Sequence, residues 1–288
     1  MAENKDAIKT VSIEKGRKTI WHLQQMKNKG EKISMVGTAY LHPMFTMLCE
    51  KAGVDLVRYT VPGETGHDRA ELVLMWTRMQ RKQAPNICLN AVMQTEDYGD
   101  PATAVRKGAQ ILTDGADSVM PMGVTNEVVK AMADNYVAVF GHIGVLSGWQ
   151  TGRFGGYRRV GKTCEDAMRV FKMGYEYQEN GMAGMTVEMT PREVTDAIAA
   201  KLRVPVIEVA AGGAADGSEM VIFDLLGFMP PEMMGKHAKV YAPVMMETIK
   251  GLAGFTQEVK TGAYPLEEHG WGMDEAELAK FNDAIAKF

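Results

Sequence analysis

The sequence lacks the features of several classes of protein. It has only three cysteines, Cys49, Cys88 and Cys164, and they are far apart. An odd number of widely spaced cysteines is typical of reduced core thiols in a cytosolic protein, and not of a disulfide framework or a zinc site. We therefore expect a cytoplasmic protein with no metal bound through cysteine.

Long apolar runs and basic blocks are also missing. No stretch of about 18 apolar residues is present, so no membrane-spanning helix is predicted. The first ten residues, MAENKDAIKT, lack the apolar stretch of a signal peptide. The formal net charge is -4, which argues against nucleic acid as a partner. We expect neither a membrane nor nucleic acid among the partners.

What the sequence does contain is a series of short apolar runs rich in valine, isoleucine and methionine. They are continuous rather than alternating, as expected of parallel strands covered on both faces. The runs span residues 33–37, 54–59, 86–92, 117–122, 137–143, 184–189, 204–209 and 220–225. Most are separated by stretches with helical signals, such as DPATAVRKGAQILTDGA, which opens with an Asp-Pro pair.

Eight strands alternating with helices on a chain of 288 residues predict an α/β fold, a (β/α)8 TIM barrel. A doubly wound open sheet is the alternative, but no GxGxxG follows the first strand. Residues 144–163 and 210–219 are glycine-rich, and long loops of this kind are often lids. We expect one domain, residues 1–288, with an N-terminal helical extension and a C-terminal helical tail that includes a helix over 236–260.

Catalytic side chains of a barrel lie at the carboxyl ends of its strands. The polar and methionine side chains at or just after the ends of the predicted strands are therefore the candidate site residues. They are Arg58, Tyr59, Thr60, Asn90, Gln94, Met120, Met122, His142, Glu188 and Glu208. The methionines would line the pocket with apolar surface, and Glu208 would either face the substrate or bind the glycine-rich backbone that follows it.

Glu188 ends an apolar run, TVEM, where a carboxylate is costly unless it is paired or protonated. Burial would raise its pKa toward the range that suits a general base. The alternative is a glutamate that caps the following helix. His142, in FGHIG, is either a catalytic residue or a satisfied structural histidine.

Several motifs resemble those of the ketopantoate hydroxymethyltransferase family, of the phosphoenolpyruvate mutase/isocitrate lyase superfamily. They are FGHIGV, FGGYRRVGK, VEMTPREVTDAIAAKLRVPVIEVAAG and GAYPLEEHG, and the resemblance extends over roughly residues 33–272. It implies a (β/α)8 barrel, a homo-oligomer, and transfer of a hydroxymethyl group from methylenetetrahydrofolate to 2-oxoisovalerate. It also implies that Glu188 abstracts the proton, that His142 is a site residue, and that the loop from Phe154 to Tyr157 covers the substrate.

The sequence departs from the family at its charged positions. The resemblance implies Mg²⁺ held by two aspartates, but Tyr59 and Val92 stand at those places, and Met120 and Met122 stand where the family has lysine and glutamate. Mg²⁺ prefers oxygen ligands, and valine offers none. We therefore expect no metal at the family's site. If the family's activity is retained, Mg²⁺ and methylenetetrahydrofolate are the cofactors implied.

Arg58 and Tyr59 suggest how such a site would work without the metal. An arginine binds a carboxylate through two N–H groups, and a tyrosine hydroxyl can donate to a developing oxyanion. The hypothesis is that these two residues replace part of the metal's electrostatic role. The alternative is that Arg58 points outward to a helix acid and Tyr59 fills the vacated space.

Three functions follow from these interpretations. The first is an enzyme that acts on a 2-oxo acid or related small carboxylate by proton abstraction and carbon–carbon bond chemistry, without strict ketopantoate synthesis. The second is a metal-independent lyase, hydrolase or tautomerase acting on a different substrate. The third is a non-catalytic, ligand-binding barrel. The retained Glu188, His142 and Tyr157 favour an enzyme.

Overall fold

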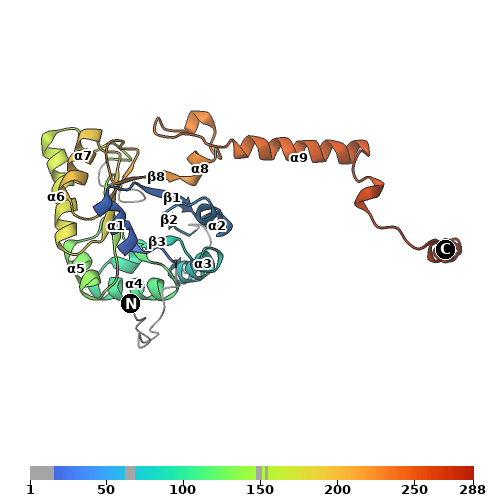
Figure 1. The fold of residues 1–288 in the computed structure, drawn as a ribbon, viewed down its shortest axis with the longest axis horizontal. Helices are drawn as coiled ribbons and strands as arrows, with labels where there is room; N and C mark the ends of the chain where they lie inside the picture. Colours follow the sequence, from blue (N-terminus) through green and yellow to red (C-terminus); the bar gives the residue numbers. More distant parts are fainter. Residues whose placement is uncertain (1–15, 62–68, 147–150, 153–154) are drawn as a thin grey trace, which may run out of the picture.

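A computed structural model describes residues 16–61, 69–146, 151–152 and 155–288 and contains the predicted (β/α)8 barrel (Figure 1). All strand pairs are parallel, in the order β4-β3-β2-β1-β8-β7-β6-β5. The strands are β1 (Ile33–Ala39), β2 (Leu56–Tyr59), β3 (Cys88–Val92), β4 (Ser118–Met120), β5 (Phe140–Gly144), β6 (Gly184–Glu188), β7 (Val206–Val209) and β8 (Gly217–Val221).

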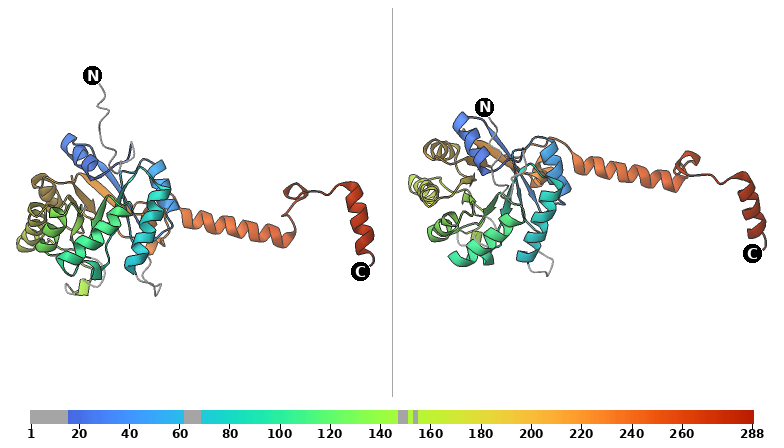
Figure 2. Two further views of the ribbon diagram at one scale, coloured as in Figure 1. Left: turned by 90° about the horizontal axis from the view of Figure 1, so that it is seen from below. Right: turned by 60° about the horizontal axis from the view of Figure 1, so that its bottom comes forward.

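A helix follows each of β1 to β6 and lies in the outer layer, whereas a loop joins β7 to β8 (Figure 2). The helices up to the end of the barrel are α1 (Ile20–Lys29), α2 (Met44–Lys51), α3 (Arg69–Gln83), α4 (Pro101–Thr113), α5 (Asn126–Asp134), α6 (Cys164–Glu179), α7 (Arg192–Lys201) and α8 (Ile222–Leu225). Several begin at polar N-cap residues, including Asp100 of the predicted Asp-Pro pair. Asp100, Thr125 and Thr163 each accept a hydrogen bond from a backbone N–H of the first turn.

The barrel closes between β4 and β5 through a single isolated bridge. Val119 pairs with Val139, and the Val119 N–H donates to the carbonyl oxygen of Ala138 over 2.9 Å. The other neighbouring strands are joined by ladders, such as the five residue pairs between β5 and β6, and the β1–β2 ladder shifts register between Gly37 and Ala39. The sheet is therefore a nearly closed barrel with one weakly paired seam.

The eighth strand lies earlier in the sequence than its most apolar run indicates. It spans Gly217–Val221, whereas residues 222–225 form the short helix α8. A Cβ atom at Gly217 would approach the Ile33 carbonyl oxygen to 2.0 Å, so glycine allows β8 to pack against β1. The predicted loop over 210–219 is shorter for the same reason, because its last three residues belong to β8.

The inside of the barrel is built in layers. At the amino-terminal end, alternate residues of the strands form an apolar cluster with Leu23 of α1, which plugs this end. The strand members of this cluster are Ile33, Met35, Leu56, Cys88, Phe140 and Ile207. A larger apolar cluster lies between the strands and the outer helices. The apolar plug leaves the polar residues of the interior at the carboxyl ends of the strands.

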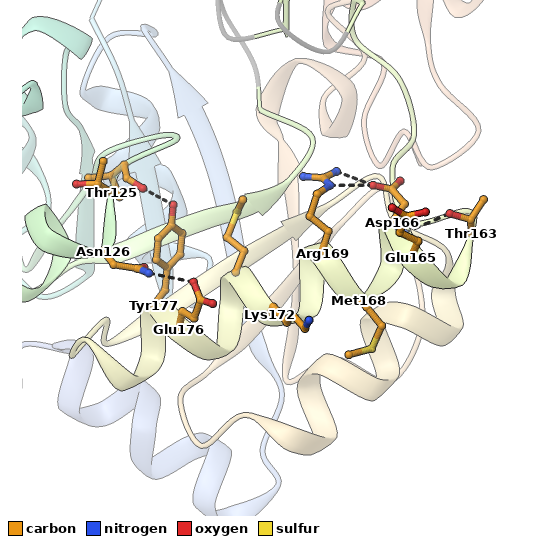
Figure 3. Close-up of a pocket in the computed structure, with 12 residues that line it drawn as sticks. Thr125, Asn126, Thr163, Glu165, Asp166, Met168, Arg169, Lys172, Glu176 and Tyr177 are labelled. Carbon is orange, nitrogen blue, oxygen red and sulfur yellow. Dashed lines mark hydrogen bonds and ion pairs between the residues drawn. The ribbon is translucent and has the colours of Figure 1, made fainter.

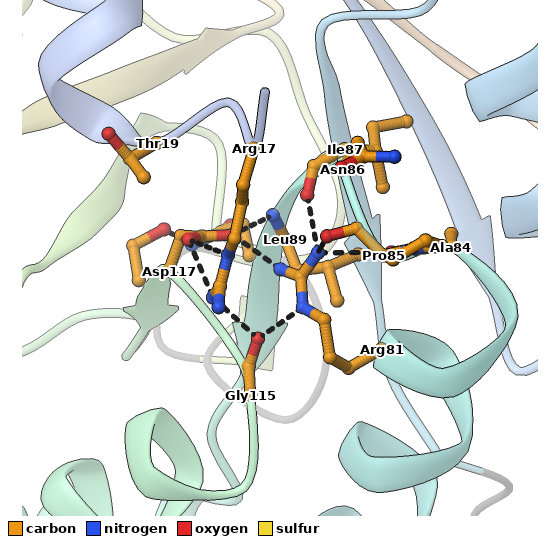
Figure 4. Close-up of polar contacts among 12 residues, drawn as sticks. Arg17, Thr19, Arg81, Ala84, Pro85, Asn86, Ile87, Leu89, Gly115 and Asp117 are labelled. Atoms are coloured by element: carbon orange, nitrogen blue, oxygen red, sulfur yellow. Dashed lines mark hydrogen bonds and ion pairs between the residues drawn. The ribbon is translucent and has the colours of Figure 1, made fainter. Parts of the chain in front are cut away.

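A buried ionic cluster ties the chain together at the amino-terminal end of the barrel (Figure 4). Asp117, just before β4, pairs with Arg17 over 2.8 Å and with Arg81 of α3 over 2.6 Å. Arg17 and Arg81 also donate to the carbonyl oxygen of Gly115, and Asp117 accepts from the Leu89 N–H. These contacts join four segments far apart in the sequence, so we assign the cluster to stability.

After the barrel, the chain leaves its surface. Helix α9 (Val244–Thr261) projects away from the barrel, and α10 (Glu275–Ile285) lies farther out still (Figures 1 and 2). Helix α9 is therefore shorter at its start than the predicted 236–260. It exposes large apolar side chains at a helical spacing, namely Met246, Ile249, Leu252, Phe255 and Val259.

Two smaller observations complete the fold. Among the described residues, no helix is both long and apolar enough to cross a membrane. Cys49 and Cys88 are buried as expected, but Cys164 is exposed at the start of α6, so the prediction of a core thiol is wrong there.

Candidate active site

Arg58 of β2 occupies the centre of the barrel, above the apolar plug. Its Nε donates to Asn90 Oδ1 over 2.8 Å, its Nη1 to Glu219 Oε2 over 2.8 Å, and its Nη2 to Thr186 Oγ1 over 2.9 Å. These partners come from β3, β8 and β6, so the guanidinium joins three strands. Three of its five N–H groups are thus used, and the other two have no partner among the described residues.

Glu219 completes this polar layer as the counter-charge of Arg58. Its side chain is 6% exposed and it also accepts from the Thr186 hydroxyl over 3.2 Å. Gly37 of the neighbouring strand makes room for it, because a Cβ atom there would lie 3.2 Å from Glu219 Oε1. The alternative in which Arg58 points outward to an acidic residue on a helix is therefore wrong, because Arg58 pairs with a carboxylate inside the barrel.

Glu188 and His142 form a second pair one layer higher. His142 Nε2 lies 2.8 Å from Glu188 Oε2 and 2.9 Å from the carbonyl oxygen of Val145. Both neighbours accept hydrogen bonds, so Nε2 carries a proton and donates. Glu188 is the last residue of β6, and His142 of the neighbouring strand β5 lies opposite Thr186, two residues before it, so the two side chains meet diagonally across the strand pair.

The environment of Glu188 lowers its pKa. Burial alone would raise it, as the sequence led us to expect, but the hydrogen bond and charge of His142, the hydrogen bond from Tyr157 and the charge of Arg58 outweigh burial. Glu188 is therefore ionised near neutral pH. It can accept a proton from a substrate without first losing one of its own.

Tyr157 brings the glycine-rich segment onto this pair. Its hydroxyl donates to Glu188 Oε1, while the rest of the side chain is 53% exposed. Burial, together with the charge of Glu188, raises the pKa of Tyr157, so its hydroxyl stays protonated. Phe154, the first residue of the FGGY motif, lies outside the described residues.

These groups share one pocket of about 400 Å³ at the carboxyl ends of the strands. Its floor is Gly37, Arg58 and Glu219, and its polar wall is His142, Glu188 and Tyr157. The rest of the lining is mostly apolar, and consists of Ala39, Tyr59, Thr60, Val92, Met120, Met122, Val209 and Val221. The predicted site residues Arg58, Thr60, Met120, Met122, His142, Tyr157 and Glu188 are thus brought together.

Tyr59 borders the pocket, but its hydroxyl points elsewhere. Tyr59 Oη lies 2.7 Å from Thr77 Oγ1 of α3, and the Thr77 hydroxyl donates to the Val73 carbonyl oxygen, so Tyr59 is the donor to Thr77. Adjacent residues of a strand face opposite sides, and Arg58 faces inward. The structure thus matches the alternative in which Tyr59 fills space and its hydroxyl is not offered to a substrate.

Three further predicted residues also lie away from the open pocket. Asn90 is fully buried beneath it, between Arg58 and Ser118. Gln94 is buried and directs its amide toward the Val92 carbonyl oxygen at 3.5 Å. Glu208 accepts from the N–H groups of Ala211 and Gly212, which is the backbone-binding alternative. Asn90 thus acts on Arg58, while Gln94 and Glu208 do not line the pocket.

The residues at this site do not fit a magnesium ion. At the two positions that the resemblance matches to the family's metal ligands, the Tyr59 hydroxyl bonds to Thr77 of α3 and Val92 has no oxygen in its side chain. The two carboxylates that line the pocket are already paired, Glu219 with Arg58 and Glu188 with His142. Within the described ranges no group of three or more His, Cys, Asp or Glu side chains could hold a metal. Glu64, His67 and Asp68 lie outside the described residues.

A second recess, of about 780 Å³, lies outside the barrel against α6 and the start of α5 (Figure 3). Several of its polar side chains are engaged with one another or with backbone. Arg169 pairs with Asp166, Asn126 donates to Glu176, and the Tyr177 hydroxyl donates to the Val124 carbonyl oxygen. Since this recess contains none of the groups around Glu188, we do not assign it a catalytic role.

Sequence reasoning missed two residues of the site, Glu219 and Thr186. Glu219 was not predicted because the eighth strand was expected at 220–225, after this residue. Thr186 lies two residues before Glu188 in the same strand, so the alternation of side chains was a usable signal.

A (β/α)8 barrel with an ionised glutamate, a histidine and a tyrosine in one pocket at its strand ends has the fold and groups of an acid–base enzyme. The chain matches the profile of the family described as ketopantoate hydroxymethyltransferase over residues 17–267. It belongs to this family of enzymes.

Individual relatives agree with this assignment. The chain is 28% identical to 3-methyl-2-oxobutanoate hydroxymethyltransferase 1 of Methylibium petroleiphilum, over 95% of this chain and 96% of that protein. It is 31% identical to 3-methyl-2-oxobutanoate hydroxymethyltransferase of Thermotoga neapolitana, over 86% of this chain and 94% of that protein. The crystal structure of 2,3-dimethylmalate lyase, a PEP mutase/isocitrate lyase superfamily member, is 12% identical with a TM-score of 0.53, over 85% and 99% of the two chains. That likeness supports the fold.

Proposed function

We propose that this protein is a metal-independent member of its family that removes a proton next to the carbonyl group of a 2-oxo acid or a related small carboxylate. The observation that carries the proposal is the pairing of ionised Glu188 with His142 Nε2 at 2.8 Å, beside the Arg58 guanidinium. In this proposal Glu188 is the base, His142 holds it in place, and Tyr157 covers it.

Arg58 supplies the positive charge in this proposal. Its two N–H groups without a described partner are available to the substrate carboxylate and to the oxygen of the enolate that forms when the proton moves to Glu188. Asn90, Thr186 and Glu219 fix the guanidinium, so little reorganisation is needed when charge develops. Tyr59 has no step in this scheme, because its hydroxyl is bound to Thr77.

The enolate formed in this way is a carbon nucleophile. It can attack an electrophile and make a carbon–carbon bond, as the family's hydroxymethyl transfer requires, or it can arise by cleavage of such a bond. Met120, Met122, Val92 and Val209 form an apolar wall for the substrate's hydrocarbon part. Because the resemblance matches Tyr59, Val92, Met120 and Met122 to charged positions of the family, we propose chemistry related to ketopantoate synthesis rather than that reaction itself, with neither Mg²⁺ nor folate assumed.

Proton exchange in D2O tests this proposal directly. The protein would be mixed with short 2-oxo acids, including 2-oxoisovalerate, in EDTA and then with added Mg²⁺. We expect loss of the C3 proton signal in EDTA, and no loss with Glu188→Gln. Exchange that appears only with Mg²⁺ would contradict metal independence. No exchange in either condition would favour another substrate class, acted on by a lyase, hydrolase or tautomerase, or a non-catalytic barrel.

We also propose a cytoplasmic homo-oligomer. The family resemblance implies assembly, and the exposed apolar side chains of α9 support it, since a second copy of the chain would remove them from water. The cytoplasmic location rests on the reduced cysteines and on the absence of a membrane-spanning helix among the described residues.

A further inference from the structure

The floor of the pocket contains a carboxylate, Glu219, and the proposed reaction uses only one of its two oxygens. Glu219 Oε2 is bound to Arg58 and Thr186, but Glu219 Oε1 has no hydrogen-bond partner among the described residues. The residue is 8% exposed and lines the pocket. A carboxylate oxygen thus remains open to whatever binds above the guanidinium.

We propose that Glu219 is a specificity-determining residue that makes the pocket select substrates with one negative charge over substrates with two. This inference rests on the proposed function, in which Arg58 binds a substrate carboxylate. One substrate carboxylate can accept from a remaining N–H group of Arg58, while the other remaining N–H group serves the enolate oxygen. A second carboxylate has no such partner and meets Glu219 or Glu188.

The charges around the pocket support this selection. Of the described residues that line it, Arg58 is the one with a permanent positive charge, whereas Glu188 and Glu219 are both carboxylates. Arg58 is already paired with Glu219 over 2.8 Å, so its charge is partly neutralised before a substrate arrives. A pocket of about 400 Å³ keeps any second carboxylate within several ångströms of one of these glutamates, where water screens little.

The hydrogen bonds around Glu219 allow a substitution that removes the charge of this side chain and keeps its contacts. In Glu219→Gln the side chain keeps its size, and its amide oxygen can still accept from Arg58 and Thr186. The negative charge is removed while the position of Arg58 is retained. Glu193→Gln is the matched control, because it removes the same charge from an exposed side chain on α7.

The test compares oxamate with oxalate, two anions of nearly the same shape that carry one and two negative charges. Binding would be measured by isothermal titration calorimetry in EDTA. We expect the native protein to bind oxamate on the order of 10- to 100-fold more tightly than oxalate. Glu219→Gln should reduce this ratio by about tenfold or more, and Glu193→Gln should leave it unchanged.

Other outcomes separate the two proposals. Equal or tighter binding of oxalate by the native protein would overturn the role of Glu219, and so would an unchanged ratio in Glu219→Gln. In both cases the Arg58 carboxylate site would stand. If the native protein bound neither anion and exchanged no 2-oxo acid proton, the proposed function would fail together with this inference.

A second measurement covers the case in which Glu219→Gln does not fold. The native protein would be titrated with malonamate and malonate, which again differ by one charge but are longer by one methylene group. Preference for malonamate supports the selection by charge. Equal binding overturns it, because the longer dianion would then have been accepted beside Glu219.

Discussion

The Nε2 atom of His142 and the Oε2 atom of Glu188 lie 2.8 Å apart, and both residues are almost completely buried. The proton on Nε2 therefore points at a carboxylate rather than at water. This contact orients Glu188 and keeps it ionised. In the proposed function, this ionised carboxylate lies next to the position of a substrate bound to Arg58.

The substitution Glu188→Gln should abolish this chemistry without removing the fold. The glutamine side chain has nearly the same shape, but it cannot take a proton, so we expect exchange of the C3 proton of 2-oxoisovalerate to fall about 10²- to 10⁴-fold. Proton NMR in D2O measures the loss, and far-ultraviolet circular dichroism checks the fold. A variant with unchanged exchange would show that another group is the base.

Glu188 should also add to stability in a pH-dependent way. Its folded-state pKa lies below the ordinary value of 4.5, so its ionised form stabilises the protein above that pH, and the contribution is lost as pH falls through the folded-state value. We compare the free energy of unfolding of the native protein with that of Glu188→Gln. The difference between the two should be smaller at pH 3 than at pH 6. Urea unfolding at several pH values measures it, and a constant difference would contradict the lowered pKa.

Tyr157→Phe should shift the pH dependence of exchange. The Tyr157 hydroxyl donates to Glu188 and helps lower its pKa, so its removal should move the acid limb of the rate profile to higher pH. The plateau rate should fall far less than in Glu188→Gln. Tyr175→Phe, at an exposed position of α6, is the control and should leave the limb in place. An unmoved limb in Tyr157→Phe would mean that this tyrosine does not touch the base in solution.

Asp117→Asn should destabilise the barrel strongly. The substitution leaves Arg17 and Arg81 without their shared counter-charge in a site where the Asp117 side chain is 4% exposed, so we expect a loss of about 3–5 kcal/mol. Asp114→Asn is the control, because its partner Arg78 has a side chain that is 57% exposed, and its loss should be below about 1 kcal/mol. Chemical denaturation gives both values, and equal losses would contradict the assigned role.

Assembly should depend on the apolar face of α9. The substitutions Leu252→Glu and Phe255→Glu each place a charge on that face, which is costly if a second copy covers it. We expect a lower molar mass by light scattering after size-exclusion chromatography. Gln257→Glu adds the same charge on the side of the helix away from Leu252 and Phe255 and should leave the mass unchanged. A native protein that is already monomeric would contradict the proposed homo-oligomer.

The fold was predictable because parallel strands covered on both faces give continuous apolar runs. The run at 184–189 becomes β6 at Gly184–Glu188, and Glu188 ends it as expected. The eighth strand was misplaced because residues 217–219, Gly-Ser-Glu, do not look apolar. Gly217 allows β1 to approach closely, and Glu219 forms an ion pair with Arg58.

The candidate site was less predictable, because its contacts join distant parts of the sequence. Glu219 is 161 residues from Arg58, and nothing local marks the two as partners. The inward direction of Arg58 and the outward direction of Tyr59 could have been separated by alternation alone. The lowered pKa of Glu188 could not have been predicted from the sequence, because it depends on the positions of His142, Tyr157 and Arg58 around the carboxylate.

The single bridge that closes the barrel has a consequence for how the pocket can change over evolution. Arg58, Glu188 and Glu219 lie on β2, β6 and β8, which do not border the seam, whereas Met120 lies on β4 at the weakly paired seam. Substitutions at that seam can widen or narrow the apolar wall while Arg58, Glu188 and Glu219 keep their spacing. Related chains can therefore diverge in the hydrocarbon part of the substrate they accept and still share one arrangement of charges.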